Sequence, residues 1–122
     1  GKQIAFKRVS AGENSIIIAD AEGGNERILR TRNAPEIYTD SVSWSPDGKL
    51  IAAPTLRLAS SYGGGIAVIE VDSGKETPIV LSDKEIIRIN RAEWTNNGKG
   101  LIFTRYTGRM GQRYQLRYVA YP

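Results

Sequence analysis

The sequence has no cysteine and no histidine among its 122 residues. Without cysteine the chain forms no disulfide, and it offers neither a thiol nucleophile nor a thiolate ligand for a metal ion. Without histidine it cannot itself supply a Ser-His-Asp triad, a histidine-ligated zinc ion or an imidazole base. These absences exclude most familiar hydrolase mechanisms from the residues given. We therefore expect no catalytic residues, no cofactor and no metal in this chain.

Long apolar runs are absent as well. No window approaches the 18 consecutive apolar residues of a membrane-spanning helix, so we expect no membrane segment. The net charge of +4 is modest and the 17 basic residues are spread along the chain, which is typical of a solvated surface. The opening residues, Gly1–Ile4, read as neither a signal peptide nor a start, which predicts a piece of a longer protein.

What is present indicates a single all-β domain. About 40% of the residues are hydrophobic and 25% are charged, which is the globular range. Thirteen glycines, together with many Thr, Ser and Asn residues, separate short apolar runs. Short runs bounded by turn residues are typical of β-strands, and the length allows one domain core.

The most informative stretch is residues 41–53, which predicts a strand, a tight turn and a second strand. Val42 and Trp44 alternate with serines, as in a half-buried strand. The residues Ser45-Pro46-Asp47-Gly48 have the composition of a type I turn, in which glycine takes the left-handed exit. An apolar run at 50–53 follows as the return strand.

This stretch is repeated. Residues 1–6 and 98–103 are weaker copies of residues 48–53, displaced by 47 and 50 positions, and Trp44 and Trp94 are also 50 positions apart. A period of this length belongs to the four-stranded blades of β-propellers. In the second full copy, Asn97 and Gly98 replace the Pro-Asp-Gly turn with equivalent chemistry. The predicted structural turn motif comprises Trp44, Ser45, Pro46, Asp47, Gly48, Trp94, Asn97 and Gly98.

The sequence therefore predicts antiparallel four-stranded blades of a β-propeller, about two and a half to three of them. We place an incomplete blade at 1–33, a complete blade at 40–84 and an incomplete blade at 89–122, with a link over 33–39. Pro54 lies within a predicted strand, so we expect a bulge or a sheet edge there. The expected strands are 4–9, 15–20 and 26–31, then 41–45, 50–58, 66–71 and 77–81, and finally 91–94, 101–106 and 115–121.

The pattern Trp-Ser-Pro-Asp-Gly-Lys-x-Ile-Ala at 44–52 resembles the WD-repeat-like propeller family of TolB, and also the propeller domains of prolyl-oligopeptidase-type peptidases. The segments 93–101 and 115–122 look like bacterial propellers that follow a kinase or winged-helix domain. In such families the turn is structural, so the resemblance gives Asp47 no catalytic role. The chain departs from the pattern where Ala53-Pro54 replaces the usual aromatic residue and where the third blade lacks Pro-Asp.

The resemblance implies a non-catalytic propeller segment that acts as a protein-interaction or sensing scaffold of a larger bacterial protein. The alternative is a segment that shapes substrate access in a prolyl-oligopeptidase-like serine peptidase, and the parent protein could carry a kinase or peptidase domain elsewhere. We expect a protein partner, with the rest of the parent propeller or self-association covering the open blade ends. A TolB-like protein would lie outside the cytoplasm, but a cytoplasmic location stays open.

Three further groups of residues are candidates for functional sites. The carboxylates Asp47, Glu70, Asp72, Glu76 and Asp83 lack the spacing of a calcium loop, and turn or hairpin positions explain them better. The two tryptophans are expected to pack between blades rather than to stack on sugars. Arginines recur every four residues near the C-terminus, but Gly108 and Gly111 favour a hairpin over a phosphate-binding helix. The resulting candidate contact for a protein partner is Arg105, Tyr106, Arg109, Arg113 and Tyr114.

Overall fold

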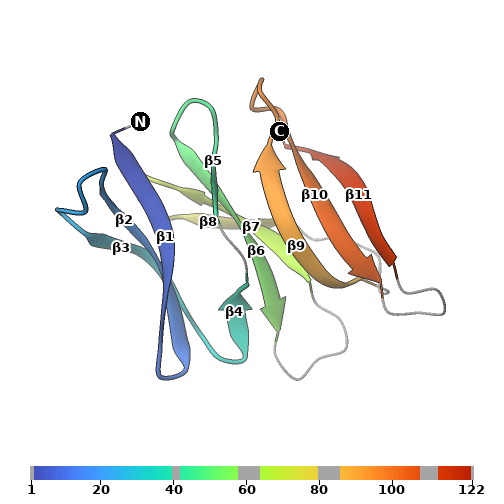
Figure 1. The fold of residues 1–122 in the computed structure, drawn as a ribbon, viewed down its shortest axis with the longest axis horizontal. Coiled ribbons are helices and arrows are strands. Elements are labelled where there is room, and N and C mark those ends of the chain that lie inside the picture. The colour runs from blue at the N-terminus through green and yellow to red at the C-terminus, as the bar shows by residue number, and fades with distance from the viewer. Residues whose placement is uncertain (1, 40–41, 58–63, 80–85, 108–112, 122) are drawn as a thin grey trace.

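The computed structural model describes residues 2–39, 42–57, 64–79, 86–107 and 113–121. Every regular element in these ranges is a β-strand, and the strands form three antiparallel sheets that stand side by side (Figure 1). This arrangement confirms the predicted all-β fold. We refer to the first, second and third sheet in chain order.

The first sheet has the order β1-β2-β3, with β1 at Gln3–Ser10, β2 at Glu13–Asp20 and β3 at Arg27–Asn33. Only Ala11 and Gly12 separate β1 from β2, and both have positive φ, 23° and 83°. A two-residue turn with positive φ at both positions matches the right-handed twist of the flanking strands.

The second sheet contains β4 (Glu36–Tyr38), β5 (Ser43–Trp44), β6 (Leu50–Arg57), β7 (Gly65–Glu70) and β8 (Glu76–Ile79). The order is β4-β6-β7-β8, and β5 also pairs with β6. The expected link over 33–39 is therefore wrong in part, because β4 pairs with residues 55–57 of β6. Residues 36–38 thus form part of a sheet edge that residues 41–45 alone were expected to form.

Pro54 explains why β4 and β5 are separate strands. β6 pairs with β7 in regular register through Pro54, so the predicted bulge is wrong for this ladder. On the other edge, β4 pairs up to Thr55 and β5 begins its pairing at Ala52. The carbonyl of Pro54 accepts a hydrogen bond from the Thr39 amide at 2.9 Å. The N–H and C=O of a residue in an antiparallel strand point to the same neighbouring strand. The position of the N–H that Pro54 lacks is therefore on the edge where β4 ends and β5 has not yet begun.

The third sheet has the order β11-β10-β9, with β9 at Ile86–Trp94, β10 at Gly100–Thr107 and β11 at Arg113–Ala120. β9 begins five residues before the predicted strand at 91–94. Its pairing with β10 shifts register between Thr104 and Arg105 and again between Tyr106 and Thr107. A shifted register of this kind is the signature of a β-bulge, and a short apolar pattern does not reveal it.

Each of the three sheets contains an equivalent backbone hydrogen bond, which shows which residues of the sheets occupy the same position. In each sheet a lysine carbonyl at the start of the strand that follows the turn accepts an amide proton from the end of the next strand. The strands β1, β6 and β10 are thus counterparts, displaced by 47 and 50 positions. The three bonds run from Ala21 N to Lys2 O (3.0 Å), from Val71 N to Lys49 O (3.0 Å) and from Tyr121 N to Lys99 O (2.8 Å).

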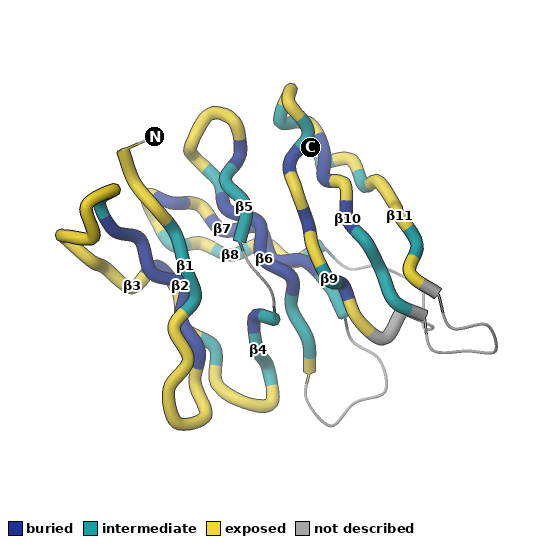
Figure 2. Tube along the Cα trace, viewed as in Figure 1, coloured by how far each residue is buried: buried dark blue, intermediate teal, exposed yellow. Residues whose placement is uncertain are grey.

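Two apolar clusters hold the sheets together, one in each space between neighbours. Burial is concentrated in β2, β6 and β7, whereas β11 is mostly exposed (Figure 2). Both faces of the second sheet are covered, because it stands between the other two. The first cluster contains Ile16, Ile18, Leu29, Tyr38, Ile51, Ala53, Ala67, Ile69 and Val71. The second contains Ala52, Ile66, Val68, Ile89, Ala92, Trp94, Leu101 and Phe103.

Candidate interaction surfaces

The two predicted turns have the same internal hydrogen bonds. Asp47 Oδ1 accepts from the Ser45 hydroxyl at 2.7 Å and from the Lys49 amide at 3.0 Å. Asn97 Oδ1 accepts from the Thr95 hydroxyl and the Lys99 amide at the same two distances. A carboxylate and a carboxamide oxygen thus close equivalent turns.

The glycines of these turns have positive φ, and the Asp47 carboxyl of the first turn has a lowered pKa. Gly48 and Gly98 have φ of 75° and 71°, the left-handed exit that the turn type requires. The hydrogen bond from Ser45, with that from the Lys49 amide, holds the pKa of the Asp47 carboxyl below its usual value. Both bonds favour the charged form, so Asp47 stays ionised while it closes the turn.

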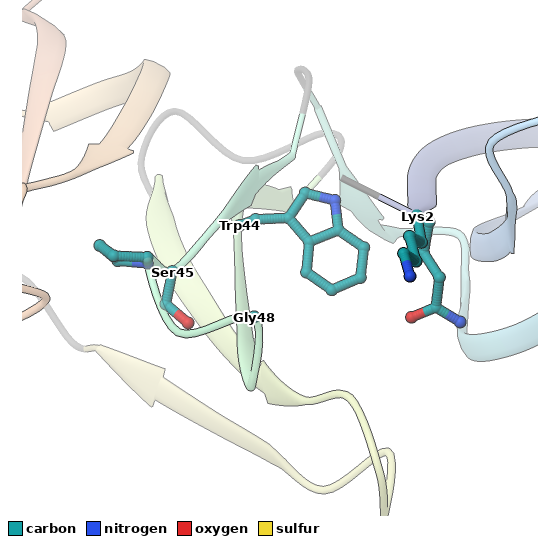
Figure 3. Close-up of a pocket in the computed structure, with 6 residues that line it drawn as sticks. Lys2, Trp44, Ser45 and Gly48 are labelled. Atoms are coloured by element: carbon teal, nitrogen blue, oxygen red, sulfur yellow. The ribbon is translucent and has the colours of Figure 1, made fainter.

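Trp94 and Trp44 occupy the same register position in different surroundings. Trp94 is 9% exposed, lies in the cluster between the second and third sheets, and donates its indole N–H to the Ser43 carbonyl at 3.1 Å. Trp44 is only half-buried and packs against the cluster between the first and second sheets. Beside it runs a groove of about 580 Å³, which Lys2 and Gln3 line from β1 (Figure 3). Pro46 and Gly48 of the turn line the same groove.

A network of charged side chains ties the first sheet to the second. Tyr38, which is fully buried, donates its hydroxyl proton to Glu76 Oε1 at 2.6 Å. Arg32 of β3 donates to Glu76 Oε2, also at 2.6 Å, and its guanidinium lies 4.9 Å from the Tyr38 ring centre. Arg30 adds a longer ion pair to Glu76 at 3.7 Å. The carboxylate of Glu76 therefore accepts protons from both sheets at once.

This network changes the pKa of two of its members. Burial, together with the hydrogen bond to Glu76, raises the pKa of Tyr38 well above its usual 10.0. Burial works to lower the pKa of Arg32, but its hydrogen bond to Glu76 and the charge of that carboxylate raise it overall. Sequence reasoning missed the network because Tyr38 and Arg32 lie 38 and 44 positions from Glu76. It had considered Glu76 only as a calcium ligand.

The candidate arginine and tyrosine contact is divided between the two faces of the third sheet. Tyr106 pairs with Tyr114, and their rings lie 5.1 Å apart. Arg105 is on the opposite face, where it donates to Gln115 Oε1 at 2.9 Å. Arg109 lies outside the described residues, and of Arg113 only the place in β11 is described. The structure thus brings two of the five residues together on one face.

That face carries an exposed apolar surface that sequence reasoning did not assemble. Alternation along β10 and β11 places Ile102, Leu116 and Tyr118 on the same side as the tyrosine pair. Leu116 is 70% exposed, Tyr118 58% and Ile102 42%. We call the surface formed by Ile102, Tyr106, Tyr114, Leu116 and Tyr118 the outer face of the third sheet.

The acidic residues considered as calcium ligands lie in different surroundings, and Glu76 belongs to the network with Tyr38 and Arg32. Asp47, Glu70 and Asp72 line a small cavity of about 300 Å³, but Lys49 lines it too. Glu70 accepts a hydrogen bond from the Ser73 hydroxyl at 2.8 Å. Among the described residues no group of three or more His, Cys, Asp or Glu side chains is arranged to hold a metal ion. Asp83 lies outside the described residues.

The described residues contain no helix that is long and apolar enough to cross a membrane. No protein-family model matches the sequence. No curated protein matches it either.

Solved structures do match. A protein from Agrobacterium tumefaciens assigned as TolB superposes on 98% of this chain with a TM-score of 0.72 and 26% identity. TolB from Acinetobacter baumannii superposes on 98% with a TM-score of 0.73 and 21% identity. The fold is that of a TolB-like β-propeller. The chain spans 39% of the length of the first TolB structure and 27% of the second.

A further match is to a prolyl endopeptidase structure, with a TM-score of 0.65 and 18% identity over 98% of this chain. The match covers 19% of that protein. At this identity the likeness describes the propeller fold alone. The TolB-like fold is therefore shared by proteins of different activity, and function has to be argued from the surfaces.

Proposed function

We propose that the chain is a non-catalytic part of a β-propeller that acts as a protein-binding or sensing scaffold in a larger bacterial protein. The parent protein would be of the kind in which a propeller follows a kinase or winged-helix domain. The TolB-like fold supports the proposal, as does the lack of histidine and cysteine in the sequence. Nucleic acid has no place in it, because the 17 basic residues are spread along the sequence.

The proposal rests on the outer face of the third sheet. In register, Leu116 corresponds to Ile66 and Tyr118 to Val68, each 50 positions earlier in the second sheet. Ile66 and Val68 belong to the face of the second sheet that packs against the third. Ile66 and Val68 are 1% and 2% exposed under the third sheet, whereas Leu116 and Tyr118 are 70% and 58% exposed. An exposed apolar surface whose register counterparts pack on protein is suited to a protein contact.

The composition of the outer face fits a protein partner. Three of its five residues are tyrosines, which combine large apolar area with a hydroxyl group and are enriched at binding hot spots. The Tyr106–Tyr114 pair and Leu116 form an apolar centre, while Arg91 and Glu93 lie exposed on the neighbouring strand β9. An apolar centre with charged residues at its margin is the usual anatomy of a protein–protein interface.

Site-specific photo-crosslinking in cells that make the full-length parent protein tests the proposal. A photoreactive phenylalanine analogue at Leu116 should give one discrete adduct with a second protein. The same analogue at Asn96, which is exposed in the turn of the same sheet, is the matched control and should give none. An adduct within the parent chain alone, or no adduct at Leu116, would contradict a scaffold role for this face.

The alternative is a segment that shapes substrate access in a prolyl-oligopeptidase-like serine peptidase, because the propeller fold is shared with the prolyl endopeptidase structure. In that case the parent protein carries a serine nucleophile outside these residues. A serine-directed covalent probe added to the full-length protein should then label it, whereas the scaffold proposal predicts no labelling.

A further inference from the structure

A cavity of about 440 Å³ lies between the first and second sheets, beside β4. β1 and the start of β2 line it on one side, and β4 with the residues next to it lines it on the other (Figure 1). β6 and β9 each contribute one residue, Leu56 and Arg88. The volume is within the range of small-molecule pockets in proteins, so the cavity is large enough to hold a ligand.

The wall that β4 forms is fixed by hydrogen bonds to the hairpin of the first sheet. The side chain of Asn14, which is 5% exposed, accepts from the Tyr38 amide at 3.1 Å and donates to the Tyr38 carbonyl at 3.4 Å. The amide of Ala34 donates to the Gly12 carbonyl at 2.8 Å. A site whose walls are held by the fold itself loses little conformational freedom when a ligand binds.

Thr39 places an unpartnered hydroxyl group at this cavity. The residue follows β4 directly and is one of those that line the cavity. Its Oγ1 is buried, and no described residue donates a hydrogen bond to it or accepts one from it. Buried polar side-chain atoms in proteins nearly always have a partner, because an unpaired one costs free energy. A ligand that accepts the proton of this hydroxyl group would remove that cost.

Lys7 of β1 adds a positive charge next to this hydroxyl group. Its ammonium group donates to the Thr39 carbonyl at 2.7 Å and to the Tyr38 carbonyl at 3.3 Å. A lysine ammonium group has three N–H donors, so these two bonds leave one donor for a further acceptor. The ammonium group and the unpartnered hydroxyl group are thus held at the same residue, where one ligand atom group can reach both.

The charges that the described residues present to the cavity favour an anion. Arg88 of β9 lines the cavity as well as Lys7. Glu13 also lines it, but alternation along β2 places the Glu13 side chain on the opposite face from that of Asn14. Two cationic side chains and a hydroxyl donor are suited to charge-assisted hydrogen bonds with an anionic acceptor.

We propose that this cavity binds a small organic carboxylate. The carboxylate accepts hydrogen bonds from the Thr39 hydroxyl and the Lys7 ammonium group, and the charge of Arg88 favours the anion. A phosphate group, with three acceptor oxygens and a higher charge, would need more donors than these. The carbon skeleton of the ligand lies against the apolar side chains that line the rest of the cavity, which are Val9, Ala34, Ile37 and Leu56. A few polar groups in an apolar lining are usual in small-molecule sites.

Fluorine NMR on the full-length protein tests the proposal, with para-(trifluoromethyl)phenylacetate as the probe. We expect its signal to broaden in a saturable way as protein is added. The uncharged amide of the same acid has the same shape and should bind at least about 10-fold more weakly, because it loses the charge-assisted bonds. Equal binding of the two compounds, or no binding of the acid, would overturn the proposal. The result is independent of crosslinking at Leu116, because the cavity and the outer face of the third sheet share no residue.

Thr39→Val separates binding from folding. It removes the hydroxyl group and keeps the shape of the side chain, so it should weaken binding of the probe about 10-fold. The melting temperature without probe should stay unchanged or rise, because the hydroxyl group has no partner among the described residues. Unchanged affinity of this variant, or a fall in its melting temperature, would overturn the role of Thr39.

A matched pair of lysine variants locates the site. Lys7→Met and Lys2→Met remove the same charge from the protein, but Lys2 lines the groove beside Trp44 and not this cavity. Lys7→Met should weaken binding of the probe about 10-fold or more, whereas Lys2→Met should leave the affinity unchanged. Equal affinities of the two variants would show that binding follows the net charge of the protein, and would overturn the proposed site.

Discussion

At the scale of single residues, Glu76 is the polar group on which the contact between the first two sheets depends. It accepts the Tyr38 hydroxyl proton and an N–H of Arg32, and it forms an ion pair with Arg30, across 38 to 46 positions of sequence. A buried carboxylate costs free energy unless it is paired, and here both oxygens have partners. The Nε of Arg32 is a buried donor in this region that has no hydrogen-bond partner.

We predict that Tyr38→Phe lowers the free energy of unfolding by about 1–2 kcal/mol, because it removes a buried hydrogen bond to a charged acceptor. Tyr118→Phe is the matched control. Its ring is 58% exposed, so it should change stability by less than about 0.5 kcal/mol. Urea unfolding at pH 7 measures both values, and equal losses would contradict the part assigned to the Tyr38 hydroxyl.

The same pair gives a test in alkaline solution. The pKa of Tyr38 is raised in the folded protein above its usual 10.0, so the folded state keeps its proton while the unfolded state loses it. The stabilisation is complete below about pH 10 and is lost as the pH rises above it. The advantage of the wild type over Tyr38→Phe should therefore shrink from pH 8 to pH 11.

At the scale of elements, the turns govern how the strands pair. Gly48 and Gly98 close equivalent turns with the same hydrogen bonds, and Gly12 closes the hairpin of the first sheet. Gly12 and Gly48 have φ of 83° and 75°, and a Cβ on either would meet no atom within 4 Å. The cost of a side chain at these positions is therefore a backbone cost and not a clash.

We predict that Gly48→Val destabilises the chain by about 2–3 kcal/mol and Gly12→Ala by about 1 kcal/mol. Both glycines lie in the left-handed region, so the difference between the two variants comes from the β-branching of valine. Gly48→Ala is the control and should behave like Gly12→Ala. Urea midpoints measure the order, and equal values for Gly48→Val and Gly12→Ala would contradict the turn assignment.

The strand and turn pattern was predictable because each signal lies within about ten residues. Apart from β4 and the first five residues of β9, alternation around Trp44 and the glycine turns predicted the described strands to within two positions at each end. β4 was not predictable, because its strand character comes from pairing with residues 55–57 and from the donor that Pro54 lacks. The division of the chain into blades at 1–33, 40–84 and 89–122 stays a prediction.

At the scale of the whole molecule, the chain consists of one fully covered sheet between two that are covered on one side. The outer face of the third sheet lies on one of these two end sheets. It was not visible as a motif, because it is made by the register between β10 and β11. The arginine and tyrosine contact that the sequence predicted is divided between the two faces of the third sheet, with Arg105 on one face and the Tyr106–Tyr114 pair on the other.

Light scattering on the purified chain tests the central claim, that the outer face of the third sheet is a protein-contact surface. We predict an average molar mass that rises with concentration above the 13.4 kDa of one chain, because the open apolar face associates. The double variant Leu116→Lys, Tyr118→Lys should stay at 13.4 kDa with the fold retained by circular dichroism. A wild-type chain that remains monomeric at all concentrations, or a discrete dimer that the double variant leaves intact, would contradict the claim.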